Sequence, residues 1–343
     1  MAGPTPAACP GAPAAAAPGA PQVPDPQAPA GTVAATIPAT GSPVTAAAED
    51  GSVWVGDHTS ALVYRIDPAT NAVKQIDPDP DHRFDHGGPL LPGLGGPWYG
   101  PFLSGTDTRA WVHIDAATNA ASTPTDLQDA LAKLGSNGAT GITETADGVW
   151  GAAADAGSID IVEFDRQDGH ELRRVTIAGP AEPSHAPRIL VSAFESIWET
   201  VDGDQVIERI DPSTGTVTAA VALPVSPVGM VAGADALYLA TADASVIRVD
   251  PATDCVTALR FLGGAATDPA TGGGDLIAVA AGTTSVLAAY DRGGLAVMDP
   301  TTLAIRKAFR VDTQDFQGAL ATTTDGTVWY PTFGNDTVLR IKP

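Results

Sequence analysis

The sequence predicts an all-β fold, a seven-bladed β-propeller in which every blade is a four-stranded antiparallel sheet. Six times along the chain an apolar residue precedes an aspartate that ends a strand, at Asp67, Asp115, Asp165, Asp211, Asp250 and Asp299. Spacings of 39 to 50 residues between these aspartates match the length of one blade. A seventh copy at residues 341–343 stops before the strand that follows the others, and residues 31–37 read like that strand. We therefore expect the N-terminal strand to complete the last blade and to cover its open edge.

Each repeat divides into four strands. The first strand leads into an Asp-Gly or glycine-rich turn, as at Asp50 and Gly51, which suits a tight hairpin. The second strand carries an aromatic residue, which we expect to fill the space between neighbouring blades. The third strand ends at the repeated aspartate, whose carboxylate can accept backbone N–H bonds in an Asx turn. The aromatic positions are Trp54, Trp98, Trp150, Trp198, Tyr238 and Trp329, with Leu287 in the sixth repeat.

The blade boundaries follow from these signals. They place six blades at residues 42–78, 88–127, 140–177, 187–223, 227–262 and 275–311, and the seventh at residues 317–343 joined with 31–37. Residues 128–134, between two blades, are expected to form one or two helical turns. Residues 1–30 hold nine prolines and eleven alanines, a composition typical of an extended, disordered spacer. The predicted organisation is this spacer followed by one propeller over residues 31–343.

The composition limits the partners that we expect. With 40 acidic and 18 basic residues the net charge is −22, which disfavours nucleic acid and an anionic membrane surface. No run of about 18 apolar residues occurs, so we expect no transmembrane segment. Sheets closed into a ring leave no edge for another chain, which favours a monomer. The expected partner is an extracellular protein, a peptide or a small molecule.

The N-terminal region bears on location. Residues 1–6 lack the basic start and apolar middle of an export signal, so the chain is either cytoplasmic or the mature form of an exported protein. The spacer favours the second, with a secreted, cell-surface or periplasmic location. Repeat alignment puts Cys255 on the side where the spacer emerges, and a spacer arm reaches on the order of 25 Å. A disulfide bond between Cys9 and Cys255 is therefore feasible, and two free thiols are the alternative.

The candidate functional residues gather on one rim. Chain direction puts the loops between blades and the loops from second to third strands on the same rim, which we call the inter-blade rim. The expected ligand-binding residues there are Asp57, His58, Asp85, Tyr99, Glu182, Arg188, Tyr290 and Tyr330. A catalytic set or a divalent-metal site would draw on His58, His82, His86, His185 and Glu199. Their spacing is not that of a zinc signature, and solvated surface side chains are the alternative, so we assign no metal and no cofactor.

Two sets of segments carry a family resemblance. The segments VDPAT (residues 249–253) and GTVAATIP (31–38), the latter followed by TGSPV (40–44), resemble the YVTN-type repeats of bacterial seven-bladed propellers. The segments DGSVW (50–54) and DGTVW (325–329) are similar to blades of the virginiamycin B lyase-like group. The first resemblance implies an exported protein that binds, scaffolds or sits at the cell surface. The second implies a metal-assisted elimination that opens an ester-linked cyclic peptide, with histidine and glutamate side chains at the channel mouth.

The residues that follow the second strands bear on the choice between these functions. Only the first of these segments offers a histidine, His58, and only the fourth a glutamate, Glu199. The sequence therefore favours a binding or scaffolding module that acts through the inter-blade rim. A metal-assisted lyase or a hydrolase with its site at the channel mouth is the alternative, so the sequence leaves open whether the chain is an enzyme.

Overall fold

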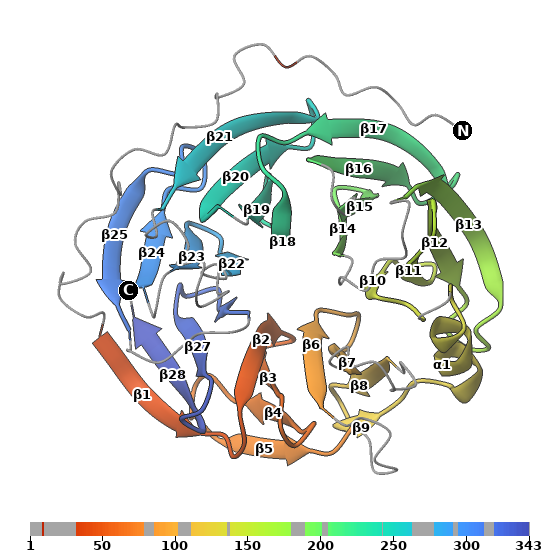
Figure 1. Ribbon diagram of the computed structural model, residues 1–343. Helices are drawn as coiled ribbons and strands as arrows, with labels where there is room; N and C mark the ends of the chain where they lie inside the picture. The colour runs from red at the N-terminus through yellow and green to blue at the C-terminus, as the bar shows by residue number, and fades with distance from the viewer. Residues whose placement is uncertain are drawn as a thin grey trace. The chain divides into compact units, whose positions relative to one another are not determined.

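The fold is built from seven sheets. The computed structural model describes residues 9, 32–78, 86–101, 111–135, 138–179, 189–200, 205–241, 243–262, 278–290, 294–311 and 319–342. Over these residues the chain forms seven four-stranded antiparallel sheets and one helix (Figure 1). This confirms the predicted fold class, a seven-bladed β-propeller. The chain divides into two compact units, one formed mainly by Ala47–Ala220 and the other by Ala7–Ala46 with Val221–Pro343.

The first unit holds four sheets, numbered here in chain order. The first sheet consists of β2 (Pro43–Glu49), β3 (Ser52–Asp57), β4 (Val63–Ile66) and β5 (Val73–Ile76), and the second of β6 (Gly87–Leu91), β7 (Trp98–Pro101), β8 (Val112–Asp115) and β9 (Ala120–Ala121). The third sheet consists of β10 (Gly141–Glu144), β11 (Val149–Asp155), β12 (Ser158–Phe164) and β13 (Glu171–Ala178), and the fourth of β14 (Leu190–Ala193), β15 (Ser196–Thr200), β16 (Val206–Asp211) and β17 (Thr216–Ala222).

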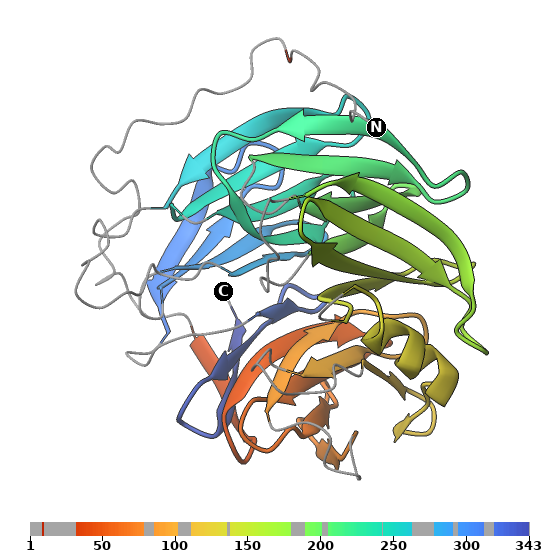
Figure 2. The same ribbon diagram turned by 45° about the vertical axis from the view of Figure 1, so that its right-hand side comes forward.

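One helix, α1 (Thr125–Ala132), follows the second sheet and is drawn in olive in Figure 2. It begins a few residues before the predicted helical segment at residues 128–134. Its apolar side chains Leu127 and Leu131 are buried in one cluster with Trp111 and with side chains of the second and third sheets. The helix therefore fills the space between these two sheets.

The second unit holds the other three sheets. The fifth sheet consists of β18 (Pro227–Ala232), β19 (Leu237–Thr241), β20 (Ser245–Asp250) and β21 (Cys255–Phe261), and the sixth of β22 (Ala278–Ala281), β23 (Val286–Tyr290), β24 (Gly294–Met298) and β25 (Ile305–Arg310). The seventh consists of β26 (Ala321–Thr322), β27 (Val328–Thr332), β28 (Thr337–Lys342) and β1 (Thr32–Pro38).

The N-terminal strand completes the seventh sheet. β1 pairs antiparallel with β28, from Thr32 opposite Lys342 to Pro38 opposite Thr337. Figure 1 shows the red β1 beside the dark blue β28. Ile37 of β1 is only 2% exposed, so the strand also contributes to the core. The prediction that the N-terminal segment supplies the missing fourth strand is confirmed.

The repeated aspartates form the turns expected of them. Asp67 Oδ1 accepts a hydrogen bond from Ala69 N at 2.7 Å, and Asp250 Oδ1 accepts one from Ala252 N at 2.8 Å. Equivalent bonds recur at Asp115, Asp165, Asp211 and Asp299. Bonds from backbone N–H groups hold the pKa of the Asp67 carboxyl below its usual value, because they stabilise the charged form. The aspartates are thus structural, which confirms the Asx turns.

The aromatic positions lie in the core, and arginines cover several of them. Trp54 is fully buried, and the residue opposite it on β4 is Arg65, whose guanidinium lies 4.9 Å from the centre of the indole ring. The same arrangement places Arg209 over Trp198 at 5.4 Å and Arg340 over Trp329 at 5.5 Å. Arg65 also donates to the carbonyl oxygen of Ala116, in the turn between β8 and β9 of the second sheet. The sequence prediction included the aromatic core but not the arginines that cover it, nor the bond from Arg65 to the neighbouring sheet.

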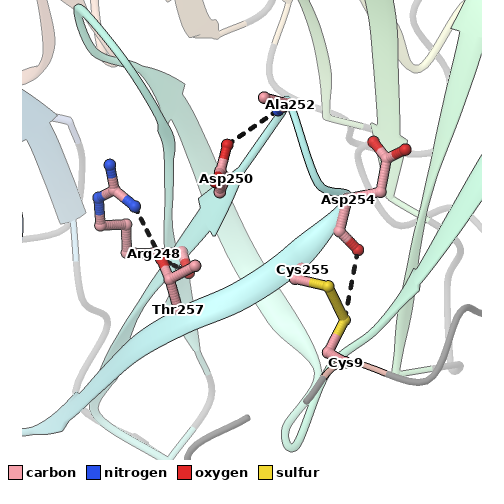
Figure 3. Close-up of a disulfide and its surroundings, with 7 residues drawn as sticks. All are labelled: Cys9, Arg248, Asp250, Ala252, Asp254, Cys255 and Thr257. Carbon is pink, nitrogen blue, oxygen red and sulfur yellow. Dashed lines mark hydrogen bonds between the residues drawn. A yellow bond between two sulfur atoms is a disulfide. The ribbon is translucent and has the colours of Figure 1, made fainter. Parts of the chain in front are cut away.

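A disulfide bond attaches the N-terminal region to the second unit (Figure 3). Cys9 and Cys255 are joined at an S–S distance of 2.08 Å, across a sequence separation of 246 residues. Cys9 Sγ lies 3.7 Å from the carbonyl oxygen of Asp254, next to the Asx turn of Asp250. The bond that the sequence showed to be feasible is therefore formed, at the start of β21.

Candidate functional site

The site begins at the end of β3, where Asp57 closes the strand. Asp57 is fully buried, and its Oδ1 accepts hydrogen bonds from the backbone N and the Oγ of Ser60, both at 2.6 Å. This local turn fixes the backbone at the inter-blade rim of the first sheet. His58 is the next residue, so the same turn positions its imidazole.

His58 forms hydrogen bonds with Gly87, the first residue of β6. Gly87 N donates to His58 O at 2.9 Å, and His58 Nδ1 lies 3.0 Å from Gly87 O. A carbonyl oxygen can only accept, so Nδ1 carries the proton in the neutral ring and Nε2 is the basic nitrogen. The hydrogen bonds therefore select one tautomer and one ring orientation.

His86 meets His58 from the second sheet. The two imidazole rings are stacked, with centroids 5.0 Å apart and an interplanar angle of 25°. His86 is exposed and His58 is half-buried. Two of the histidines predicted for the inter-blade rim thus come together, although 27 residues of sequence lie between them. They offer adjacent imidazoles that can accept or donate protons, stack on a ring or bind a cation.

Tyr99 of β7 lies beneath this pair. It is fully buried, and its hydroxyl donates to Asp57 O at 2.7 Å. Burial and then the Asp57 carboxylate raise the pKa of Tyr99 well above its usual value, so it stays a neutral donor. A Cβ at Gly87 would lie only 1.6 Å from Tyr99 Oη and 2.0 Å from Asp57 O. The contact between the two sheets therefore requires glycine at position 87, a requirement that the sequence analysis missed.

The other predicted residues belong to other sheets or lie outside the described part of the chain. Glu199 is fully buried in β15 of the fourth sheet, directly opposite Glu208 of β16, and burial raises the pKa of Glu208. Tyr330 of β27 is 1% exposed within an apolar cluster, and Tyr290 ends β23. Five predicted residues lie outside the described part of the chain: Asp85, His82, Glu182, His185 and Arg188. A ligand contact by any of these residues stays a prediction.

A second group of polar side chains lies in the turn between β12 and β13. Asp165, Asp168 and His170 place one potential ligand atom each within 4.8 Å of one another. His170 Nδ1 lies 2.5 Å from Asp168 Oδ1, and Asp165 Oδ1 accepts from Gln167 N at 2.7 Å. The hydrogen bond to Asp168 raises the pKa of the exposed His170. Because the same Asx turn recurs in other repeats, the turn explains this group without a metal.

The fold and this rim define a seven-bladed β-propeller with a histidine pair between its first and second sheets. Two solved structures resemble it: "Structure of U3-55K", with a TM-score of 0.67, 10% identity and coverage of 91% of this chain and 100% of that chain, and "Crystal structure of RRP9 WD40 repeats", with a TM-score of 0.66, 11% identity and coverage of 91% and 98%. At such identities the likeness establishes the fold alone.

Comparisons of sequence do not assign a family. No family model matches the chain, and no curated protein matches it. The resemblance to YVTN-type and virginiamycin B lyase-like propellers is therefore not confirmed. In the part of the chain that the structure describes, no helix is long and apolar enough to cross a membrane.

Proposed function

We propose that the protein is an exported binding or scaffolding module that recognises an extracellular protein, peptide or small molecule through the inter-blade rim. The observation that carries this proposal is the contact between His58 and His86, whose rings come from two sheets and lie 5.0 Å apart. The bond between Cys9 and Cys255 supports export, because disulfides persist mainly in oxidising compartments.

His58 is ordered before any ligand arrives. Its carbonyl oxygen accepts from Gly87 N, and its ring Nδ1 donates to Gly87 O, so the side chain has little rotational freedom left to lose. A side chain that is already ordered adds less entropic cost to binding. A fixed imidazole beside the exposed imidazole of His86 is the arrangement expected of a recognition surface.

Paired histidine variants test the proposal. The wild-type protein, the His58→Ala/His86→Ala variant and the His170→Ala variant would be immobilised and exposed to the culture medium and cell-surface extract of the producing cells. His170 is an exposed histidine in the turn between β12 and β13, which makes it a matched control. Bound species would be identified by mass spectrometry and their affinities measured on the purified molecules.

The expected result is a species retained by the wild type and by His170→Ala but lost, or weakened at least tenfold, in the double variant. A tenfold loss corresponds to about 1.4 kcal/mol of binding free energy. Equal retention by all three proteins would contradict recognition through the histidine pair. Circular dichroism and thermal unfolding would establish that the double variant is folded.

A metal-assisted lyase is the second candidate, and the contact between His58 and His86 favours it as well. Two adjacent imidazoles supply two of the nitrogen ligands that zinc prefers. Adding zinc should then raise the midpoint of thermal unfolding of the wild type and of His170→Ala, but not of His58→Ala/His86→Ala. If zinc leaves all three midpoints unchanged, the metal-dependent alternative is wrong.

A further inference from the structure

The turn between β6 and β7 is held by carboxylates from two other sheets. Glu49, the last residue of β2, has both carboxylate oxygens 3.2 Å from Gly93 N. Glu144, the last residue of β10, accepts a hydrogen bond from Leu94 N at 2.6 Å. This turn therefore connects the first, second and third sheets, at the other end of β3 from His58.

The close approach depends on the glycines of the turn. A Cβ at Gly93 would lie 2.6 Å from Gly96 O and 2.8 Å from Glu144 Oε2. Gly95 and Gly96 have φ angles of +79° and +143°, which other residues rarely adopt. The backbone can thus turn consecutive N–H groups toward the two carboxylates, an arrangement that binds negative charge.

The two carboxylates have different electrostatic surroundings. Glu144 forms an ion pair with Arg166, whose Nη1 lies 3.2 Å from Glu144 Oε1. Arg166 Nη2 also donates a hydrogen bond to Thr145 O. Glu49 instead faces two acidic groups, Asp50 on its own hairpin and Glu144 on β10. Burial, followed by these charges, raises the pKa of Glu49 to about 7, although N–H groups of the turn act in the opposite direction.

We propose that Glu49 is a proton-controlled latch: with its proton it holds the β6–β7 turn between the first and third sheets, and without its proton it loosens the turn. Loss of the proton leaves two negative carboxylates, Glu49 and Glu144, against the same short segment, with Asp50 beside them. Arg166 compensates the charge of Glu144. A charged Glu49 would accept stronger hydrogen bonds from the turn, but the cost of burying the charge and its repulsion by Asp50 and Glu144 outweigh this gain, so loss of the proton favours opening of the turn.

Opening of the turn can be measured by cleavage at Leu94. This side chain is 54% exposed and lies in the middle of the turn, so chymotrypsin should cut after it when the turn opens. If the carboxyl of Glu49 has an ordinary pKa in the open turn, linkage gives about a tenfold rise in the open population between pH 6 and pH 8. Glu49→Gln keeps the size and the hydrogen-bond acceptor but cannot ionise.

The experiment compares cleavage of the wild type with that of Glu49→Gln at each pH, so that the pH dependence of the protease cancels. The ratio of wild-type to variant rates should rise about tenfold from pH 6 to pH 8. Glu195→Gln is the matched control, because Glu195 is an exposed glutamate in the corresponding turn between β14 and β15, and its ratio to the wild type should stay constant. A ratio for Glu49→Gln that does not change with pH would overturn the proposal.

A second measurement needs no variant. In the wild-type protein labelled with nitrogen-15 glycine, the amide resonance of Gly93 should titrate with a midpoint near pH 7, because its N–H faces the Glu49 carboxyl. Glu144→Gln should move this midpoint to lower pH by removing a negative neighbour. A Gly93 resonance that does not move between pH 5 and pH 8.5 would also overturn the proposal.

Discussion

Replacing Cys255 with serine should lower the free energy of unfolding by about 2 kcal/mol, well below the value expected from the length of the loop alone. The bond spans a sequence separation of 246 residues, and closing a loop of that length in the unfolded chain is worth about 5.5 kcal/mol. In the folded protein the same bond also closes a shorter loop, from Cys9 to the start of β1 at Thr32. The sequence predicts a spacer without packed structure for this segment, and on that expectation closing the shorter loop also costs entropy in the folded state.

The size of the effect follows from the two loop lengths. Closing the loop of about 23 residues in the folded protein costs about 3.4 kcal/mol by the same relation. The difference, about 2 kcal/mol, is the stabilisation that the bond should contribute. For a domain of this size it corresponds to a shift of about 3 °C in the midpoint of thermal unfolding.

Equilibrium unfolding in urea measures this difference. Cys9→Ser, Cys255→Ser and the double variant should lose the same free energy, because each removes the same single bond. A thiol titration should find one reactive thiol in each single variant, one from each half of the broken bond. A loss near 5.5 kcal/mol would refute the reasoning, since it would mean that the spacer is already restricted in the folded state. A loss below about 0.5 kcal/mol would contradict the loop-closure argument itself.

Three further changes have expected outcomes. Deleting residues 32–37 should remove cooperative thermal unfolding, because the deletion exposes the edge of β28 and takes Ile37 out of the core. Cooperative unfolding of the deletion variant would contradict completion of the seventh sheet by β1. Gly87→Ala should lower the free energy of unfolding, measured in urea, by about 3 kcal/mol. The control Gly157→Ala should lower it by about 1 kcal/mol, because the added Cβ there meets no atom within 4 Å. Similar losses in the two variants would refute the steric argument. The free energy of unfolding should decrease as the pH rises from about 4.5 to about 7, because the pKa of Glu49 is raised in the folded state. In Glu49→Gln this decrease should be smaller by about 2 kcal/mol, a value that allows for solvent screening. Below about pH 4 the free energy of unfolding should instead fall as the pH falls, because the pKa of the Asp299 carboxyl is lowered in the folded state and the stability that it adds is lost on protonation. An unchanged slope between about pH 4.5 and about pH 7 in Glu49→Gln would contradict the assignment of that slope to Glu49.

Most of the fold could be predicted because its signals are local and repeated. Each Asx turn marks the end of a third strand, so the sheet boundaries follow from the sequence to within a few residues. The start of α1 was missed by three residues, because the helix begins at Thr125 and the sequence analysis placed the helical segment at residues 128–134. The contact of Arg65 with Trp54 and Ala116 could not be predicted in the same way, because it depends on how two sheets pack.

The candidate site was predictable only in part. Chain direction brings His58 and His86 to the same end of neighbouring sheets, which is why they could be expected on one rim. Tyr99 follows an aromatic position of the core and was expected to reach a ligand, yet its hydroxyl is bonded inside the protein. The raised pKa of Glu49 depends on burial and on Glu144, a contact across three sheets that no spacing in the sequence indicates.

The disulfide determines how the protein bears mechanical force. Tension applied to the chain ahead of Cys9 passes through the sulfur atoms to Cys255 and enters the fifth sheet at the start of β21. The N-terminal end of β1, which pairs with β28, is then not pulled directly. When the bond is reduced, the same tension runs along the spacer to Thr32 and pulls directly on the strand that completes the seventh sheet. The oxidation state of two sulfur atoms thus selects which sheet resists the pull.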